Sequence, residues 1–205
     1  MRARLLSLFE NLKAPSERSA QKKILTHGGS KAAGKRKLKR PLATKKWTHL
    51  VLKSSKARGQ YSMLKQSNSK WIEKLIETKA KKFSVEVKEP VNMGNHLHLR
   101  FRITSRHAFQ NFLRSITSLI ARHVTGARKG KIFGKFWDGL AFTRVLMTSC
   151  EERRLRVYFV ANRIERQHGY LAREEFLKDV YQRSNCERSK ISRLERSTQD
   201  QLINY

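Results

Sequence analysis

The sequence has few acidic residues and no long apolar segment. Asp and Glu number 16 against 46 Lys and Arg, which gives a formal net charge of +30 at pH 7. A free globule of this charge repels itself, so the composition favours a polyanionic partner, with nucleic acid ahead of a membrane surface. No apolar run approaches the roughly 20 residues of a spanning helix, and mean hydropathy is −0.66. We therefore expect no membrane segment.

Cysteine is also scarce. Cys150 and Cys186 lie far apart and form no CxxC motif, so neither a zinc site nor a disulfide framework is indicated. The first apolar stretch is short and is interrupted by Glu10, which argues against a signal peptide. We expect a cytoplasmic protein with one domain of ordinary size plus tails.

Composition divides the chain into three segments. Residues 1–46 hold fourteen Lys and Arg and two Glu, with glycines that break any long helix. They predict a flexible basic arm, which either contacts phosphates without reading sequence or is a solvated tail. Residues 47–170 carry the periodic patterns of a folded domain, and residues 171–205 predict an accessory helix and a frayed tail.

Hydrophobic periodicity predicts seven elements in the central segment. They are a strand over 47–53, a helix over 69–82, a strand over 83–88 ended by Pro90, a strand over 95–103, a helix over 107–124, a strand over 133–146 broken near Asp138, and a helix over 150–167 ended by Gly169. This order predicts an α+β fold of the ferredoxin-like type. It is an antiparallel βαββαβ sheet with helices mainly on one face and an added carboxy-terminal helix.

The strand over 95–103 carries the strongest chemical signal. Its alternation sends four apolar side chains to one face and His96, His98, Arg100 and Arg102 to the other. Neighbouring imidazoles on one face can share a divalent cation, and the arginines would lie where an anionic substrate reaches that cation. The alternative is that two imidazoles merely lie on a half-solvated sheet.

Cations gather in and beside the predicted strands and loops. The candidate nucleic-acid-binding residues are Lys53, Lys56, Arg58, Arg100, Arg102, Lys131, Lys135 and Arg144. Each either contacts a phosphate or belongs to a solvated charged face. The neighbouring aromatic residues Phe136, Trp137 and Phe142 either stack on bases or belong to the core.

Four motifs in order carry a family resemblance over roughly residues 47–170. They are His49-Leu50-Val51-Leu52, Met93-Gly94-Asn95-His96-Leu97-His98, Phe136-Trp137 with Arg144-Val145, and Tyr158-Phe159-Val160-Ala161-Asn162. This set resembles the HUH single-tyrosine transposases, meaning the insertion-sequence 200-like enzymes and their REP-associated branch. The family commonly has proline where this chain has Gly94, and we expect a turn there all the same.

The resemblance implies a site and a reaction. His96 and His98 would bind a divalent metal, Mg²⁺ or Mn²⁺, with Asn162 as a third ligand, and Tyr158 would be the nucleophile. The substrate would be single-stranded DNA, often folded as a hairpin, and attack would leave a 5′-phosphotyrosine link and a free 3′-OH for strand transfer. Tyr158 and Asn162 are four residues apart, which places them on one helical face. The alternative is a tyrosine packed on the sheet.

Two other functions remain open from the sequence. A non-catalytic basic nucleic-acid-binding protein would also explain the charge of +30. An HUH nickase of the replication-initiator or relaxase type would share the chemistry, although such enzymes often carry a second tyrosine near the first. Insertion-sequence members are typically homodimers with exchanged tyrosine helices, whereas the REP-associated branch can act as a monomer, so a homodimer is one of two arrangements.

Overall fold

The computed structural model describes residues 25–29 and 39–202, with side chains as far as residue 183. Most of the predicted basic arm and the last three residues of the predicted tail lie outside these ranges. The chain forms two compact units, Met1–Arg153 and Arg154–Tyr205. None of the described helices is both long enough and apolar enough to cross a membrane.

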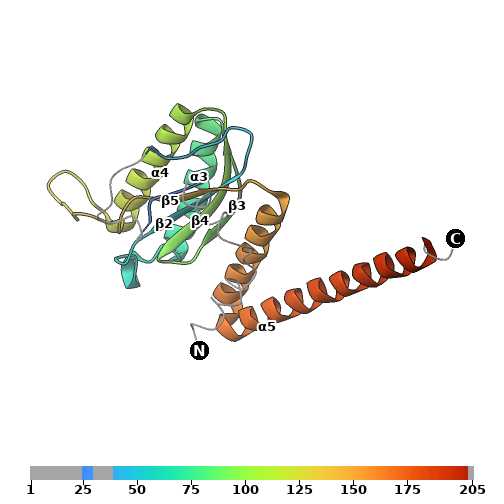
Figure 1. The fold of residues 1–205 in the computed structure, drawn as a ribbon. Helices are drawn as coiled ribbons and strands as arrows, with labels where there is room; N and C mark the ends of the chain where they lie inside the picture. Colours follow the sequence, from blue (N-terminus) through green and yellow to red (C-terminus); the bar gives the residue numbers. More distant parts are fainter. Residues whose placement is uncertain (1–24, 30–38, 203–205) are drawn as a thin grey trace. The chain divides into compact units, whose positions relative to one another are not determined.

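The first unit is built on a five-stranded antiparallel sheet (Figure 1). Its strands are β1 (Thr26–His27), β2 (Thr48–Lys53), β3 (Val85–Asn92), β4 (His96–Ile103) and β5 (Phe142–Val145), in the order β1-β5-β2-β4-β3. Helices α3 (Gln66–Lys82) and α4 (Arg106–Thr125) cover one face, and a short 3-10 turn, η2 (Gly59–Tyr61), follows β2. The predicted ferredoxin-like α+β fold is confirmed.

The core lies between the two helices and the sheet because β4 alternates as predicted. Leu97, Leu99, Phe101 and Ile103 are all at most 4% exposed and pack with apolar side chains of α3 and α4. Helix α4 begins where the Ser105 side chain accepts a hydrogen bond from the backbone N–H of Ala108, 3.1 Å away. The helix ends at Gly126, which takes the left-handed conformation at φ 66°.

Two predicted strand boundaries were wrong. Pro90 does not end β3, because a bulge between Lys88 and Val91 lets the strand continue to Asn92. Strand β3 is an edge strand, where a residue without an N–H is tolerated. The fourth predicted strand, 133–146, shrinks to Phe142–Val145 because residues before it form a loop. Asp138 holds this loop by accepting hydrogen bonds from the backbone and hydroxyl of Ser55 at 2.7 and 2.8 Å.

Strand β1 was not predicted. It lies within residues 1–46, for which the sequence predicted only a basic arm. In β1, Thr26 pairs with Arg144 and His27 with Thr143, on the free side of β5. The backbone N–H of Gly29 extends the pairing by donating to Leu140 O at 2.9 Å. A two-residue strand has no periodicity of its own, so its position depends on a partner more than 100 positions away.

Helix α5 spans Ser149–Leu202 and is interrupted at Gly169. This glycine has φ 87° and ψ 178°, a combination that a side chain with a Cβ rarely adopts. The predicted end of the first helical stretch at Gly169 is therefore confirmed, and the chain continues as helix beyond the kink. Arg173 and Glu165 form an ion pair of 3.2 Å that spans the kink in sequence.

A tight turn leads into β4 at Gly94. This residue has φ 86°, its N–H donates to Asn92 Oδ1 at 3.0 Å, and its carbonyl accepts from Met63 N at 3.0 Å. Asn92 in turn donates through Nδ2 to Met63 O at 2.7 Å. The expected turn forms, and it depends on a positive φ and on a backbone donor that proline lacks.

Replacing Gly94 with proline is therefore expected to destabilise this chain by about 2–5 kcal/mol, because it imposes a negative φ and removes the N–H that donates to Asn92 Oδ1. Thermal unfolding would show a fall in Tm on the order of 5–15 °C. The matched control is Gly139→Ala, where an added Cβ meets nothing within 4 Å. Equal melting temperatures for Gly94→Pro and the unaltered protein would contradict this account of the turn.

Candidate active site

The face of the sheet turned away from α3 and α4 gathers imidazoles and guanidiniums. As predicted, His96, His98, Arg100 and Arg102 follow one another along this face of β4. In the neighbouring strand, Lys53 lies opposite His96 and His49 lies opposite Arg100. Because side chains on one face repeat every two residues, this register brings His49 diagonally next to His98.

Each β4 histidine has a hydrogen-bond partner at its Nδ1 atom. His98 Nδ1 lies 3.1 Å from His49 Nε2, and His96 Nδ1 lies 2.6 Å from Asn95 Oδ1. An amide oxygen only accepts, so His96 Nδ1 donates and Nε2 keeps a lone pair when the ring is neutral. When His98 Nδ1 donates to His49, its Nε2 is likewise left as a ligand atom, the usual arrangement for metal-binding histidines.

The pKa shifts of two of these imidazoles favour the neutral state. Burial, with a smaller contribution from the charge of Arg144, lowers the pKa of His49 to about 3. Burial, followed by the charges of His49 and His96, lowers the pKa of His98 to about 2. Both rings are therefore neutral at pH 7, which is the form of histidine that coordinates a metal.

The two β4 histidines could bind a divalent cation only together with oxygen ligands. In the described part of the chain, no three His, Cys, Asp or Glu side chains come together as a metal site. The His96 and His98 rings are perpendicular neighbours, with centroids 4.7 Å apart. Two imidazoles supply two nitrogen ligands, so a cation there would complete its shell with oxygens from an amide, water or phosphate.

In the second unit, Tyr158 and Asn162 lie one turn apart on α5, as predicted. Tyr158 is half-buried, and its ring centroid is 6.4 Å from that of Phe159. Asn162 is 3% exposed, and its Nδ2 is buried with no hydrogen-bond partner among the described residues. A buried NH2 group without a partner is costly, and as a donor it suits an acceptor such as a phosphate oxygen, whereas a cation would bind Oδ1.

A group of cations surrounds Trp47 on the histidine-bearing face. Arg100 is 2% exposed, with its guanidinium carbon 4.7 Å from the Trp47 ring centroid, and Lys88 and Arg102 lie at 5.3 and 5.1 Å. Glu89 is 3.4 Å from Arg100 Nη2, while Nε and Nη1 have no partner in the described residues. Arg100 is thus a buried cation, unlike the surface lysines with which the sequence grouped it.

The predicted DNA-binding cations fall into distinct settings. Lys53, Lys56 and Lys135 gather near Asp138, and the last two line one shallow hollow beside Phe136. Arg102 is bound to Glu86 at 2.5 Å and Arg144 to Glu151. Arg58 and Lys131 are exposed in loops apart from these pairs.

The three aromatic residues that were candidates for base stacking also lie in different environments. Phe136 is 4% exposed and belongs to the core, so it is not a base-stacking residue in this structure. Trp137 is half-buried and donates through Nε1 to Thr117 O at 2.9 Å. Phe142 lies edge-on to His49, with centroids 6.2 Å apart, and so supports the histidine cluster.

Sequence reasoning placed His49 on the first strand without identifying its contact with His98, because that contact requires the strand register. It also missed Arg40, Arg106 and Arg114, which line a second hollow on the helix-bearing side. The sequence did contain a signal for this hollow, because polar residues recur every four positions along α4 at Arg106, Gln110 and Arg114.

Comparisons with known proteins agree with this architecture. A solved REP-associated tyrosine transposase bound to a REP hairpin superposes with a TM-score of 0.52 at 12% sequence identity, covering 66% of this chain and 76% of that one. A candidate transposase from Deinococcus radiodurans R1 gives a TM-score of 0.39 at 19% identity, covering 62% and 97%, a likeness too weak to carry an argument. No curated protein matches the chain.

The decisive match is to a protein-family model. The model, described as "Transposase IS200 like", aligns with residues 43–167, which is more than half of the chain. This span includes the His-x-His strand and the Tyr158 helix turn, and the first solved relative shares the same sheet and helix arrangement. The chain belongs to the IS200-like transposase family.

Proposed function

We propose that this transposase cuts and rejoins single-stranded DNA through Tyr158, which attacks a phosphodiester and forms a 5′-phosphotyrosine link. The bond from phosphorus to the 3′ oxygen breaks, and that oxygen leaves as a 3′-OH. Because the phosphotyrosine keeps the bond energy, a 3′-OH can later attack it, reform the phosphodiester and release Tyr158. The presence of a His-x-His strand and a Tyr-x-x-x-Asn helix turn within the span of the IS200-like family model supports this proposal.

We assign Nε2 of His96 and Nε2 of His98 as the ligands of a divalent cation, Mg²⁺ or Mn²⁺, with Asn162 as a third ligand. When bound, such a cation polarises the phosphate and eases departure of the leaving oxygen. Asn95 and His49 hold the two imidazoles in the tautomers that expose Nε2. Arg100, two residues beyond His98 on the same face, would stabilise negative charge on the phosphate.

Tyr158 and Asn162 share one helical face, and we propose that this positions the nucleophile and a metal ligand together. One turn of helix fixes their separation, and any movement of this part of α5 moves both. Asn162 is 3% exposed, so water has little access to its amide.

The proposed DNA substrate carries a hairpin. Two observations support it: the net charge of +30, which suits a polyanion, and the solved relative of the same fold, which was captured on a REP hairpin. The lysines around Asp138 would contribute phosphate contacts that do not read sequence.

The direct test is incubation with labelled hairpin oligonucleotides and Mn²⁺ or Mg²⁺, followed by a denaturing gel. The proposal predicts a covalent protein–DNA band that EDTA prevents. A nickase would give the same band without joining a second DNA strand, so an acceptor oligonucleotide is included to detect strand transfer. DNA binding without a band under any of these conditions would favour a non-catalytic DNA-binding protein.

Salt dependence tests the lysines that lie near Asp138. The double variant Lys56→Gln and Lys135→Gln is expected to reduce the slope of log K against log salt concentration by about 1.4, since each contact to a single strand contributes about 0.7. Lys74→Gln is the matched control, because Lys74 is exposed on α3 and does not line the hollow beside Asp138. Equal slopes for the double variant and the unaltered protein would remove these lysines from the DNA interface.

Mixing two inactive variants tests whether a homodimer shares its sites. Tyr158→Phe protein retains the histidines, and His96→Ala protein retains the tyrosine. Recovered cleavage in the mixture requires Tyr158 of one protomer to act with the histidines of another. No recovery means that each chain uses its own pair.

A further inference from the structure

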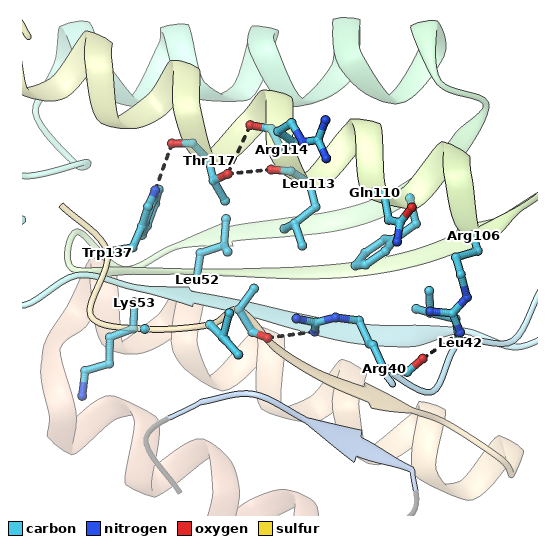
Figure 2. A pocket seen from close by; sticks show the side chains of 14 residues that line it. Arg40, Leu42, Leu52, Lys53, Arg106, Gln110, Leu113, Arg114, Thr117 and Trp137 are labelled. Atoms are coloured by element: carbon cyan, nitrogen blue, oxygen red, sulfur yellow. Dashed lines mark hydrogen bonds between the residues drawn. The ribbon is translucent and has the colours of Figure 1, made fainter. Parts of the chain in front are cut away.

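A hollow of about 430 Å³ lies on the helix-bearing side of the sheet, the side opposite the histidines (Figure 2). Helix α4 forms one wall, and the loop before β5 and the segment around Arg40 form the other. Leu52 of β2, whose cross-strand partner is Leu97 of the core, contributes to the floor. All of these residues belong to the first unit.

The cations of the hollow have no carboxylate among the residues that line it. Arg106, Gln110 and Arg114 follow one another at intervals of one helical turn along α4, so two arginines flank one glutamine along the helix. Arg40 faces them from the opposite wall, while the Lys53 side chain points away from α4 in Figure 2. The hollow therefore presents positive charge that the described residues do not neutralise.

Arg40 is held as a fixed part of the wall. Its Nη1 donates to Ala141 O at 2.8 Å and to Thr143 Oγ1 at 2.7 Å, and its own carbonyl accepts from Arg106 Nη2 at 2.8 Å. Burial, followed by the charge of Arg106, lowers the pKa of Arg40 to about 10. Two like charges held this close would be stabilised by an anion in the hollow.

The floor and one end of the hollow are apolar and aromatic. Phe109 of α4 is one of the lining residues. Leu113 of α4 lies above Leu52, and Trp137 stands at the end, fixed by its hydrogen bond to Thr117 O (Figure 2). Thr117 follows Arg114 by three residues, so the carbonyl that holds Trp137 lies about one helical turn from Arg114. An anion with a flat, partly apolar body would use both features.

We propose that this hollow binds one unpaired nucleotide, with its phosphate on Arg106 and Arg114 and its base against Trp137 and the apolar floor. Volumes of about 300–1,000 Å³ accommodate small organic ligands. Guanidiniums bind phosphate through paired hydrogen bonds, and aromatic side chains stack on bases without regard to sequence. The proposal rests on the proposed function only for the source of the nucleotide, a DNA strand rather than a free mononucleotide.

Gln110→Glu is the sharpest variant for the test. The exposed glutamine and its replacement are nearly isosteric. The new carboxylate lies one helical turn from each arginine, so its attraction to them supports the helix. The same negative charge repels a bound phosphate. Gln66→Glu makes the same change at an exposed position on α3 that does not line the hollow. Both changes are made in Tyr158→Phe protein, so that cleavage cannot affect the titration.

Calorimetric titration would use deoxythymidine 5′-monophosphate, thymidine, inorganic phosphate and an oligothymidylate. We expect the monophosphate to bind more tightly than thymidine or phosphate, and the oligonucleotide more tightly still. Gln110→Glu is expected to weaken monophosphate binding at least about tenfold and Gln66→Glu less than about twofold.

Several results would overturn the inference. Equal weakening by both variants would place the bound nucleotide elsewhere, and phosphate binding as tightly as the monophosphate would reduce the hollow to a simple anion site. An acidic peptide that binds while the monophosphate does not would identify a protein partner instead. A monophosphate that binds as tightly as the oligonucleotide would overturn the assignment to a DNA strand. None of these titrations requires cleavage. An absence of tyrosine chemistry would therefore leave nucleotide binding unchanged, whereas an absence of this site would abolish it.

Discussion

Replacing Tyr158 with phenylalanine is expected to abolish the covalent protein–DNA product, with the cleavage rate falling at least about 1,000-fold. The substitution removes one oxygen, which is the atom that would form the bond to phosphorus, and removal of a covalent nucleophile in other enzymes costs about 10⁴–10⁶ in rate. Tyr158 is half-buried on α5, and phenylalanine keeps the ring that packs there. Hairpin binding and Tm are expected to stay the same.

The measurement is single-turnover cleavage of a labelled hairpin oligonucleotide in Mn²⁺, with thermal melting and DNA binding measured on the same preparation. Tyr181→Phe is a matched control, since it makes the same change at a more exposed position of the same helix. A Tyr158→Phe protein that still forms the covalent band would assign the nucleophile to another residue. Loss of binding together with the band would show damage to the fold rather than to the chemistry.

The second large effect is expected from the histidine pair. Changing His96 or His98 to glutamine removes one nitrogen ligand, and we expect metal-dependent cleavage to fall at least about 100-fold with weaker Mn²⁺ binding. His49→Gln is expected to weaken Mn²⁺ binding about 10–100-fold, because His49 orients His98 without being a ligand itself. Higher Mn²⁺ concentrations would therefore restore more activity to His49→Gln than to His98→Gln.

Calorimetric Mn²⁺ titration and cleavage at graded Mn²⁺ concentrations test this order. His107→Gln is the control, since His107 is exposed on α4 and contacts Asn111, 2.8 Å away, rather than the cluster. His98 is 3% exposed, so each variant is also melted to separate loss of metal from loss of folding. Folded His96→Gln protein that binds Mn²⁺ as tightly as the unaltered protein would rule out the assigned ligand.

The sequence was sufficient for the elements whose signals are local. Strand β4 alternates cleanly, and its apolar face is buried as its period of two requires. Gly126 and Gly169 interrupt helices because each takes a backbone conformation that other residues avoid. The two-residue separation of His96 and His98, and the four-residue separation of Tyr158 and Asn162, follow in the same way from strand and helix geometry.

The sequence was insufficient to predict features that depend on contacts between segments far apart in the chain. The contact between His49 and His98 depends on a strand register that places His49 opposite Arg100. The shortening of β5 depends on Asp138, which bonds to Ser55 across 83 positions. The wall of the second hollow depends on Arg40, which reaches Ala141 and Thr143 across more than 100 positions.

Strand β1 has a practical consequence for any attempt to trim this protein. It pairs with the side of β5 that β2 leaves open, and Leu25 O adds a hydrogen bond from Val145 N at 3.1 Å. A shortened chain that starts at residue 47 would leave this side of β5 bare. An exposed row of backbone donors and acceptors recruits strands from other molecules, so such a chain is expected to self-associate and precipitate where the longer one stays dispersed.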